Sequence, residues 1–409
     1  MAEQLFLKAT PRVWVIALCK AALNPLMRIY YRIKLVDCPA TDLKRLDAVR
    51  RKRVVFVSNH VDRRDAVIAF HLSKLLSDRF YFMSNREQLQ EGTLYTWLLR
   101  SSGVFSIARG VVDIASIKYT TKLLSGGKPV RLFLFPEGGA YSRNDSAFPF
   151  LVQPFDLILR ARALLARSRP DETIYVVPVA IRYEYQKVDA EIAKALIQLE
   201  AAVGLPISTR DVDFVHRLVA IGNALVDSFD RMFDLEPQAD EVDVQSKGMR
   251  IKRHLVESLR AQMAEVGGEE PNRAKATATT ELEDARNVLN ELYARHPSAR
   301  VDKAFAPQTE YEKALRTQSF ERMARIFEDA HRLENWIALD RDYFREKVTT
   351  HRIIDTIVRL EREVFGEVRW SAERTCALRV GDPIDVSNYD AAEQLATNSR
   401  EQVIALLNS

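Results

Sequence analysis

Between residues 53 and 185, short apolar runs alternate with stretches that have helical spacing. The runs are rich in Val, Ile, Phe and Tyr, which favours strands, and the stretches between them repeat apolar residues every three or four positions, which favours helices. This alternation is typical of an α/β core, a central mixed but largely parallel sheet flanked by helices. The predicted strands are RVVFVS, FYFMS, GVFSI, VRLFLF and TIYVVPVAI.

The pattern changes after this core. Residues 186–370 carry amphipathic helical patterns and no strand pattern, and the polar, glycine-containing stretch at residues 267–280 is their most loop-like part. CALRVGDPIDV, residues 376–386, then predicts one more strand, with a final helix after it. Because a lone strand has no partner in a helical domain, we expect it to return to the first sheet. Residues 186–370 are therefore predicted to be a large all-helical insertion, and residues 371–409 the end of the core.

Residues 1–52 are basic, and apolar and aromatic side chains such as Trp14 and Leu18 lie among the charges. The segment is predicted to be helical and amphipathic. This mixture suits a helix that lies on an anionic membrane surface, and it suits equally a helix that caps its own domain. No run reaches the roughly 18 to 20 apolar residues that span a bilayer, so we expect a soluble or peripheral protein and not one that spans the membrane.

The composition narrows the classes of protein to which the chain can belong. With 47% hydrophobic and 28% charged residues the chain has the profile of an ordered globular protein, and its net charge of +4 is small. No nucleic-acid partner is predicted. Cys19, Cys38 and Cys376 show neither pairing nor metal-ligand spacing, no signal-peptide pattern is present, and no histidine lies in a ligand array. We expect no metal and a cytoplasmic protein, peripheral on the cytosolic face of the membrane.

His60 and Asp65 stand directly after the first predicted strand, in SNHVDRRDA. A strand, a polar turn and a helix starting near Asp65 would place both side chains at the carboxyl edge of the sheet, where α/β folds usually hold their sites. Asp65 could accept a hydrogen bond from one imidazole nitrogen and leave the other to take a proton from a hydroxyl. An H-x4-D pair alone is more often a helix N-cap beside a loop histidine.

Two further runs end on side chains that suit a phosphorylated ligand. GVFSIAR finishes on Arg109, whose planar fork of donors fits a phosphate. LFLFPEGGAYSRND delivers Glu137 into a glycine turn, where Gly138 lets the backbone approach a ligand and Arg143 is available for a phosphate. On its own, Arg109 would more often be a surface arginine, and the run that contains Glu137 is also acceptable as plain turn chemistry.

The last run, VVPVAIRY, contains Pro178 inside a strand that otherwise reads as central. Proline there predicts an edge, a bulge or a strand end, because it has no N–H to donate.

Together the four runs, NH-x4-D, G-x-F-x-I-x-R, FPEG and VVPV, resemble the four-block signature of the glycerolipid acyltransferase family. A bacterial member of that family is the 1-acylglycerol-3-phosphate acyltransferase. The resemblance covers about residues 50 to 185, and RVGDPIDV resembles the family's closing strand. The helical block looks like the long insertion of a bacterial subgroup, with either a structural role as a lid or dimer contact, or a part in an acyl tunnel or carrier-protein site.

The resemblance implies roles for single residues. His60 would be the general base and Asp65 its orienter. Arg109 would hold the phosphate of the acceptor, Glu137 its glycerol hydroxyl and Gly138 the turn beneath it. Pro178 would lie on the acyl-chain side. The other substrate-binding positions that it implies are Asn59, Gly103 and Arg143.

The implied reaction moves a fatty acyl group from acyl-CoA or acyl-carrier protein to the hydroxyl of a lysophospholipid, most simply 1-acylglycerol-3-phosphate, without a cofactor. A thioester is already activated, so proximity, a base and donors for the oxyanion suffice. Two departures from the family pattern, Gly139-Ala140 after the third block and Arg63-Arg64 inside the first, leave glycerol 3-phosphate or another lysolipid open as acceptor. A non-catalytic lipid-binding scaffold of the same fold is the alternative from another class. The oligomeric state stays open.

Overall fold

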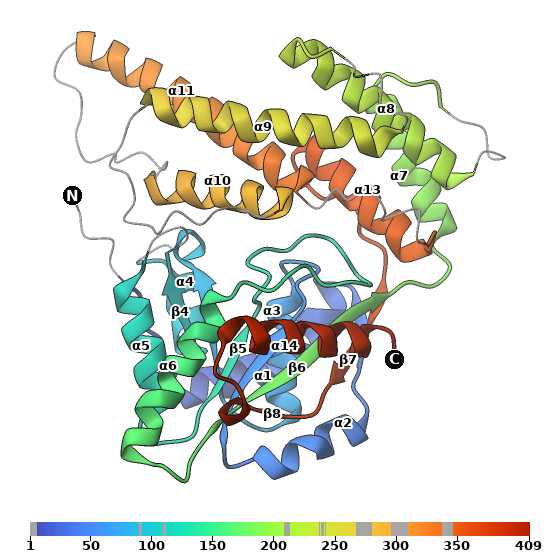
Figure 1. Cartoon of the computed structure of the whole chain (residues 1–409). Coiled ribbons are helices and arrows are strands. Elements are labelled where there is room, and N and C mark those ends of the chain that lie inside the picture. Colours follow the sequence, from blue (N-terminus) through green and yellow to red (C-terminus); the bar gives the residue numbers. More distant parts are fainter. Residues whose placement is uncertain are drawn as a thin grey trace.

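The computed structural model shows an α/β layer with a layer of helices over one end of it (Figure 1). It describes most of the chain, namely residues 6–89, 92–108, 112–207, 213–236, 238, 241, 243–266, 280–295, 310–337 and 347–409.

One mixed sheet runs through the α/β layer in the order β1-β7-β6-β2-β5-β3-β4, and β8 pairs with β6 beside this path. β6 is antiparallel to β7 and β8, whereas the other neighbours along the described sheet are parallel. The predicted mixed, largely parallel sheet is thereby confirmed. The strands are β1 (Ile33–Asp37), β2 (Arg53–Ser58), β3 (Phe80–Asn85), β4 (Val104–Ile107), β5 (Arg131–Leu134), β6 (Ile174–Glu184), β7 (Arg374–Val380) and β8 (Ile384–Asp385).

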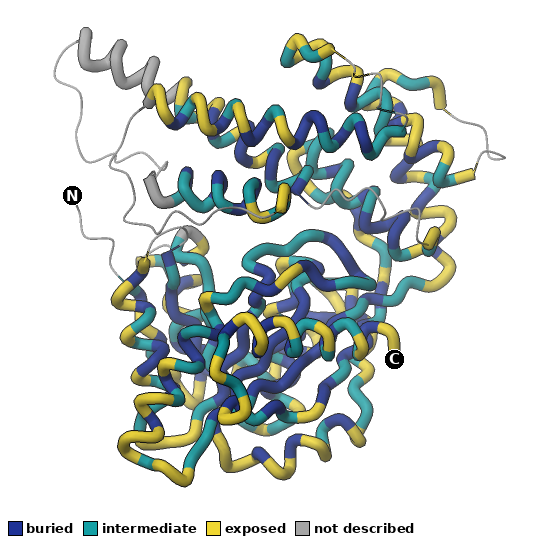
Figure 2. Tube along the Cα trace, viewed as in Figure 1, coloured by how far each residue is buried: buried dark blue, intermediate teal, exposed yellow. Residues whose placement is uncertain are grey.

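Helices cover both faces of this sheet, which explains why its central strands are apolar without interruption. In β2, Val54 and Phe56 belong to one buried cluster, and Val55 and Val57 belong to the other. Side chains alternate across a strand, so the two clusters are the two faces, and Figure 2 shows the sheet as the buried centre of this layer. The helices of the layer are α1 (Val13–Ile29), α2 (Ala40–Arg45), α3 (Asp65–Leu75), α4 (Leu94–Ser101), α5 (Ile114–Ser125), α6 (Gln153–Ser168) and α14 (Ala392–Leu407).

The second layer is helical and lies in the chain between β6 and β7. Its side chains form two buried clusters of their own. Because β7 then pairs with β6 and β1 of the first sheet, the prediction of a helical insertion before the last strands is confirmed. Residues 267–279 of the predicted loop lie outside the described part of the chain. The helices are α7 (Asp189–Ala202), α8 (Phe214–Phe233), α9 (Val244–Val266), α10 (Glu281–Arg295), α11 (Glu310–Trp336) and α13 (Thr350–Phe365).

The N-terminal segment corrects one prediction. Residues 1–52 were expected to be helical, but after α1 the chain forms β1, which pairs in parallel with β7 near the other end of the sequence. Only Ile33 of this five-residue strand is buried. A strand so short and so exposed has no local signature, since its pairing with a distant partner decides its structure.

Pro178 lies in the middle of β6, neither at an edge nor at a strand end, but the pairing on one side of the strand is interrupted there, as the prediction of a local irregularity required. On one side β6 pairs with β2 from Ile174 to Val179, and on the other it pairs with β8 at Tyr175 and Val176 and with β7 from Val179. The Pro178 carbonyl accepts a hydrogen bond from Gly381 N at 2.8 Å. The ring nitrogen faces that same side, where β6 changes partner, so the sheet loses no bond by having proline there.

The parallel strands β2, β5 and β6 end beneath the helical layer (Figure 1). The loops that follow β2 and β5 therefore lie between the sheet and the insertion. These are the loops that carry His60 and Glu137.

Candidate active site

His60 and Asp65 meet in the turn between β2 and α3. His60 Nδ1 lies 2.9 Å from Asp65 Oδ2, and the imidazole is 19% exposed while the carboxylate is fully buried. A carboxylate accepts hydrogen bonds, so the Nδ1 hydrogen points to Asp65 and Nε2 is left as the acceptor. Asp65 is not the N-cap of α3, since that position is Arg64 and lacks a side-chain cap bond. The contact between His60 and Asp65 therefore argues against the interpretation of the H-x4-D motif as an ordinary helix N-cap beside a loop histidine.

Asp65 accepts two further hydrogen bonds. Tyr183 Oη donates to Oδ1 at 2.6 Å, and the backbone N–H of Asp62 donates to Oδ2 at 2.9 Å. Burial, and then the charge of Asp65, raises the pKa of Tyr183 well above its usual value, so the phenol stays protonated and remains a donor. The three donors fix the carboxylate, and the carboxylate in turn fixes the imidazole.

Phe135 holds the imidazole from one face. The two rings are stacked, with centroids 4.2 Å apart and an angle of 21° between their planes. Phe135 follows β5 directly, so the strand next to β2 in the sheet supplies this contact. One edge of the ring is bound by Asp65 and one face by Phe135, which leaves the Nε2 edge for a ligand.

Glu137 holds the His60 loop in place through a hydrogen bond. Its Oε1 accepts a hydrogen bond from the backbone N–H of His60 at 2.9 Å, and the residue is 2% exposed. Burial raises the pKa of Glu137 to about 8, even though Arg286 and two backbone donors favour the charged form. These contacts favour a bracing role over the predicted direct contact with a substrate hydroxyl.

The glycine turn after Glu137 is closed by the helical insertion. Gly138 has φ +78°, and a Cβ there would lie 2.6 Å from a methyl carbon of Leu151, so only glycine fits this turn. Arg286 of α10 donates to the carbonyls of Glu137 and Pro149, both at 3.1 Å. The insertion therefore contacts the site directly.

A second clamp runs from α13 to the same loop. Arg352 binds the carboxylate of Asp145 at 2.8 Å, and Asp355 accepts a hydrogen bond from Asn144 N at 2.9 Å. The amide side chain of Asn144 donates to the carbonyl of Tyr183 at 2.6 Å and accepts from its N–H at 2.7 Å. This path joins α13 to the residue that holds Asp65.

Two residues predicted to bind substrate have other roles in the structure. Asn59 is fully buried and exchanges two 2.9 Å hydrogen bonds with the backbone of Ile181, so it fixes β2 to β6. Gly103 lies at the amino end of β4, away from the carboxyl edge. It has φ +106°, and a Cβ there would lie 2.3 Å from the carbonyl oxygen of Phe80. Its function is to let two strands approach.

The predicted phosphate ligands are only partly described. Arg109 lies outside the described residues, and Arg143 is buried with its guanidinium 4.5 Å from the centre of the Phe148 ring. Closer to His60, the carboxylate of Asp62 contacts Arg374 at 3.1 Å and Arg64 at 3.7 Å. Burial would raise the pKa of Asp62, but these arginines outweigh it and the pKa is lowered.

Sequence reasoning missed Tyr183 and Arg286. Tyr183 had a usable signal, since a tyrosine inside a buried strand needs a partner for its hydroxyl. Arg286 lies on an amphipathic helix among many charges, and its sequence context does not distinguish it from a surface arginine.

The geometry supports one kind of chemistry. An oriented imidazole with an open Nε2 edge, a buried carboxylate behind it and arginines beside it can take a proton from the hydroxyl of an anionic ligand.

Comparison with known proteins agrees with this chemistry. Residues 41–182 match the family model described as Acyltransferase, a span that contains His60, Asp65 and Glu137. The match confirms the resemblance to the glycerolipid acyltransferase family and does not separate its subgroups. A search of curated proteins found no match.

Replacing Glu137 with Gln tests whether the buried carboxyl group keeps its proton near neutral pH. The unfolded chain loses this proton near the ordinary value of 4.5, whereas the folded protein keeps it up to about pH 8. Between these values the unfolded state binds fewer protons, so the free energy of unfolding of the wild type falls as pH rises. Gln does not titrate. The free energy of unfolding of Glu137→Gln, relative to wild type, should therefore rise by about 3 kcal/mol from pH 5 to pH 8.

Urea unfolding at several pH values measures this difference. The exposed Gln394→Ala is the control, and because this change removes no titrating group, its difference from wild type should stay constant. An equally constant difference for Glu137→Gln would show that the carboxyl is ionised across this range.

Proposed function

We propose, for a chain whose residues 41–182 form an acyltransferase-family domain, that the protein moves a fatty acyl group from a thioester to the hydroxyl of a lysophospholipid. The donor is acyl-CoA or acyl-carrier protein, and the simplest acceptor is 1-acylglycerol-3-phosphate, which becomes phosphatidate. The observation that carries the proposal is the 2.9 Å contact between His60 Nδ1 and the buried Asp65, which leaves Nε2 as the proton acceptor. The proposed reaction uses no cofactor.

The proposed reaction has two steps. Nε2 of His60 takes the proton of the acceptor hydroxyl while that oxygen attacks the thioester carbonyl carbon. The tetrahedral intermediate then collapses, the C–S bond breaks, and the imidazolium gives its proton to the departing thiolate. The products are an ester and a free thiol, and no acyl-enzyme forms. Asp65 stabilises the imidazolium between the two steps.

Positive charge beside His60 supports a phosphorylated acceptor. Arg63 is exposed and Arg64 is half-exposed, within four residues of the base. The carboxylate of Asp62 faces both Arg64 and Arg374, so two guanidinium groups share one carboxylate at this place. We propose that the phosphate binds on this side of His60, with Arg109 as a further ligand. The packing of Arg143 on Phe148 makes that arginine a supporting residue.

An apolar surface supports attachment to a membrane. Its exposed side chains come from α1 and α4, which lie side by side: Trp14 contacts Trp97 with ring centres 6.0 Å apart, and Thr10 N donates to the carbonyl of Arg100. Arg12 lies over the ring of Trp97. No helix within the described residues is long and apolar enough to cross a bilayer. The exposed apolar side chains are Val13, Trp14, Leu18, Leu26, Ile29, Tyr30, Leu94, Tyr95, Trp97 and Leu98.

Aromatic side chains mixed with arginine suit the boundary between headgroups and acyl chains of a bilayer. We therefore propose that α1 and α4 together rest on the cytosolic face of the membrane. Such a position would give the site access to lysophospholipids.

His60→Ala is the test of the base. We expect a loss of transfer of about 10² to 10⁴-fold, the usual contribution of general base catalysis. Purified protein is incubated with acyl-CoA or acyl-carrier protein and a panel of lysophospholipids plus glycerol 3-phosphate, and thiol release is followed. His331→Ala, an exposed histidine of α11, is the control. Equal thioester consumption by His60→Ala and wild type would contradict the mechanism, and no turnover by the wild type with any pair would favour a non-catalytic scaffold.

Tyr183→Phe tests whether the hydroxyl on Asp65 positions the base. Losing a hydrogen bond to a charged group costs about 1.5 kcal/mol, so we expect kcat to fall about tenfold with little change in KM. An Asp65 carboxylate with one donor fewer would hold the imidazolium more firmly, so the acid limb of the pH profile of kcat/KM should move to higher pH. Tyr175→Phe on the same strand is the control. If the variant lost thermal stability but kept the wild-type pH profile, Tyr183 would contribute to packing and would not position the base.

The double variant Trp14→Ser with Leu94→Ser tests the membrane surface. Burying each side chain is worth roughly 1.5 to 3 kcal/mol, so partitioning onto anionic vesicles should fall by more than about tenfold. Leu164→Ser, an exposed leucine on α6 at the other face of the sheet, should sediment with vesicles as wild type does. Equal loss in both proteins, or no loss in the double variant, would place the membrane contact elsewhere.

A further inference from the structure

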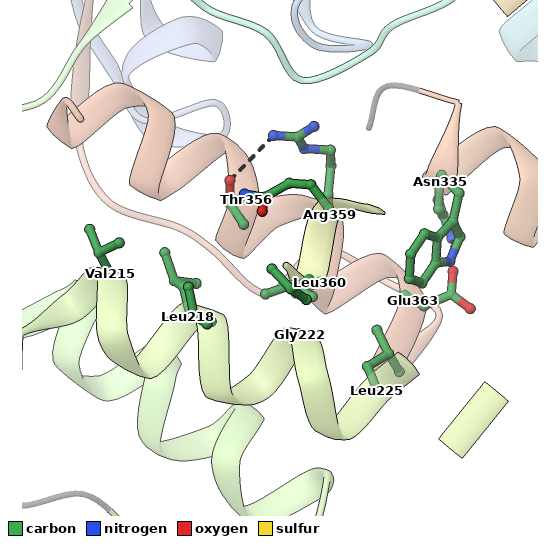
Figure 3. Close-up of a pocket in the computed structure, with 13 residues that line it drawn as sticks. Val215, Leu218, Gly222, Leu225, Asn335, Thr356, Arg359, Leu360 and Glu363 are labelled. Atoms are coloured by element: carbon green, nitrogen blue, oxygen red, sulfur yellow. Dashed lines mark hydrogen bonds between the residues drawn. The ribbon is translucent and has the colours of Figure 1, made fainter. Parts of the chain in front are cut away.

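The last turn of α13 carries an arginine of the insertion, Arg362, on the side of the active site. Arg362 and Asp355 lie seven positions apart, which is about two helical turns, so both are on one face of α13. Asp355 binds the loop over the sheet at Asn144, so this face is directed toward the sheet. A different face of the helix, with Leu360 and Glu363, lines a pocket against α8 and α11 (Figure 3).

Arg362 lies within electrostatic reach of the turn between β2 and α3. Burial lowers the pKa of Arg362, the charge of Asp62 opposes this shift, and the charge of Arg63 adds to it. Asp62 and Arg63 are the second and third residues after His60. The insertion therefore places a guanidinium group beside the turn that carries the proposed base.

The carboxylate of Asp62 does not neutralise Arg362, because it already has other partners. It contacts Arg374, the first residue of β7, at 3.1 Å and Arg64 at 3.7 Å. Arg374 is buried, and its guanidinium also lies 3.8 Å from the centre of the Tyr183 ring. Arg374 is thus engaged in holding the turn, and it takes up most of the negative charge of Asp62.

Arg362 is a half-buried cation that has no partner of its own. Among the residues that the structure describes, its guanidinium makes neither a hydrogen bond nor an ion pair. The carboxylate of Glu334 also acts on its pKa, but that carboxylate accepts a hydrogen bond from Tyr293 Oη at 2.8 Å. Arg63 is exposed and repels Arg362. Partly desolvated, mutually repelling cations are stabilised when an anion binds between them.

We propose that Arg362 binds a phosphate group of a substrate together with Arg63 and Arg64. The planar fork of donors on each guanidinium matches phosphate oxygens, and a dianion offsets the repulsion between the arginines. The choice of a substrate phosphate rests on the proposed function. The insertion, which lies outside the span that matches the family model, would then supply a residue that selects the substrate.

The phosphate has two sources, the headgroup of the acceptor and the CoA part of the donor. Both present the same chemistry to an arginine. The experiment therefore includes one soluble ligand of each kind.

Calorimetric binding of 1-hexanoylglycerol-3-phosphate to the full-length protein, beside the uncharged 1-hexanoylglycerol, tests the inference. Arg362→Met removes the guanidinium and keeps an unbranched side chain, so the phosphorylated ligand should bind at least about tenfold more weakly. The uncharged ligand should bind as it does to wild type, a difference that a merely structural role of Arg362 would not produce. Arg325→Met, at an exposed position of α11, removes the same charge from the insertion and is the matched control.

Arg63→Met tests the same site from the other side. It changes an exposed side chain, so the variant should fold normally and should also bind the phosphorylated ligand more weakly. Repeating both titrations with CoA separates the sources: a loss confined to the phosphorylated acceptor assigns the site to the headgroup, and a loss confined to CoA assigns it to the donor.

Unchanged binding of both phosphorylated ligands in Arg362→Met, an equal loss in Arg325→Met, or no binding of either ligand to the wild type would overturn the proposal. Binding needs no turnover, so the two proposals can fail separately. Acyl transfer that depends on His60, with ligand binding that does not depend on Arg362, would overturn this inference alone. Binding that depends on Arg362, without any acyl transfer, would remove the proposed function alone.

Discussion

The site depends on the hydrogen bonds that the buried carboxylate of Asp65 accepts. The carboxylate receives hydrogen bonds from the imidazole of His60, the phenol of Tyr183 and the backbone of Asp62. A fully buried carboxylate is costly unless its acceptor sites are filled, and here the partners come from the turn between β2 and α3 and from the strand β6. The same bonds that make the burial tolerable also fix the direction in which His60 presents its free nitrogen.

The helical insertion completes this arrangement. α10 holds the turn after Glu137 through Arg286, and α13 holds the loop at Asn144 through Asp355. The loops after β2 and β5 therefore have the sheet beneath them and the insertion above. A site held from both sides keeps its geometry without a ligand, which is what general base catalysis requires. The insertion therefore supports the site directly, whereas a domain that was merely appended would not contact these loops.

Much of this architecture could be predicted from the sequence, because the signals were local. The apolar strand before His60, the helix after it and the five-residue spacing to Asp65 place the two side chains at one edge of the sheet. The return of the last strands followed from a simple constraint, that a lone strand needs a partner. In contrast, β1 could not be predicted, since only pairing with β7 makes it a strand. The burial of Glu137 and its hydrogen bond to the His60 backbone could not be predicted either, because its partners lie in another loop and, for Arg286, on another layer.

The central claim is that Asp65 holds the proton on Nδ1 of His60 and leaves Nε2 free. Nitrogen-15 NMR of the histidine rings, at alkaline pH where the imidazole is neutral, tests this most directly, with His60→Ala used to assign the resonance. We predict that Nδ1 carries the hydrogen in the wild type and that Asp65→Ala yields a mixture of the two tautomers. A His60 ring protonated at Nε2 in the wild type, or the same tautomer with and without the Asp65 carboxylate, would contradict the account.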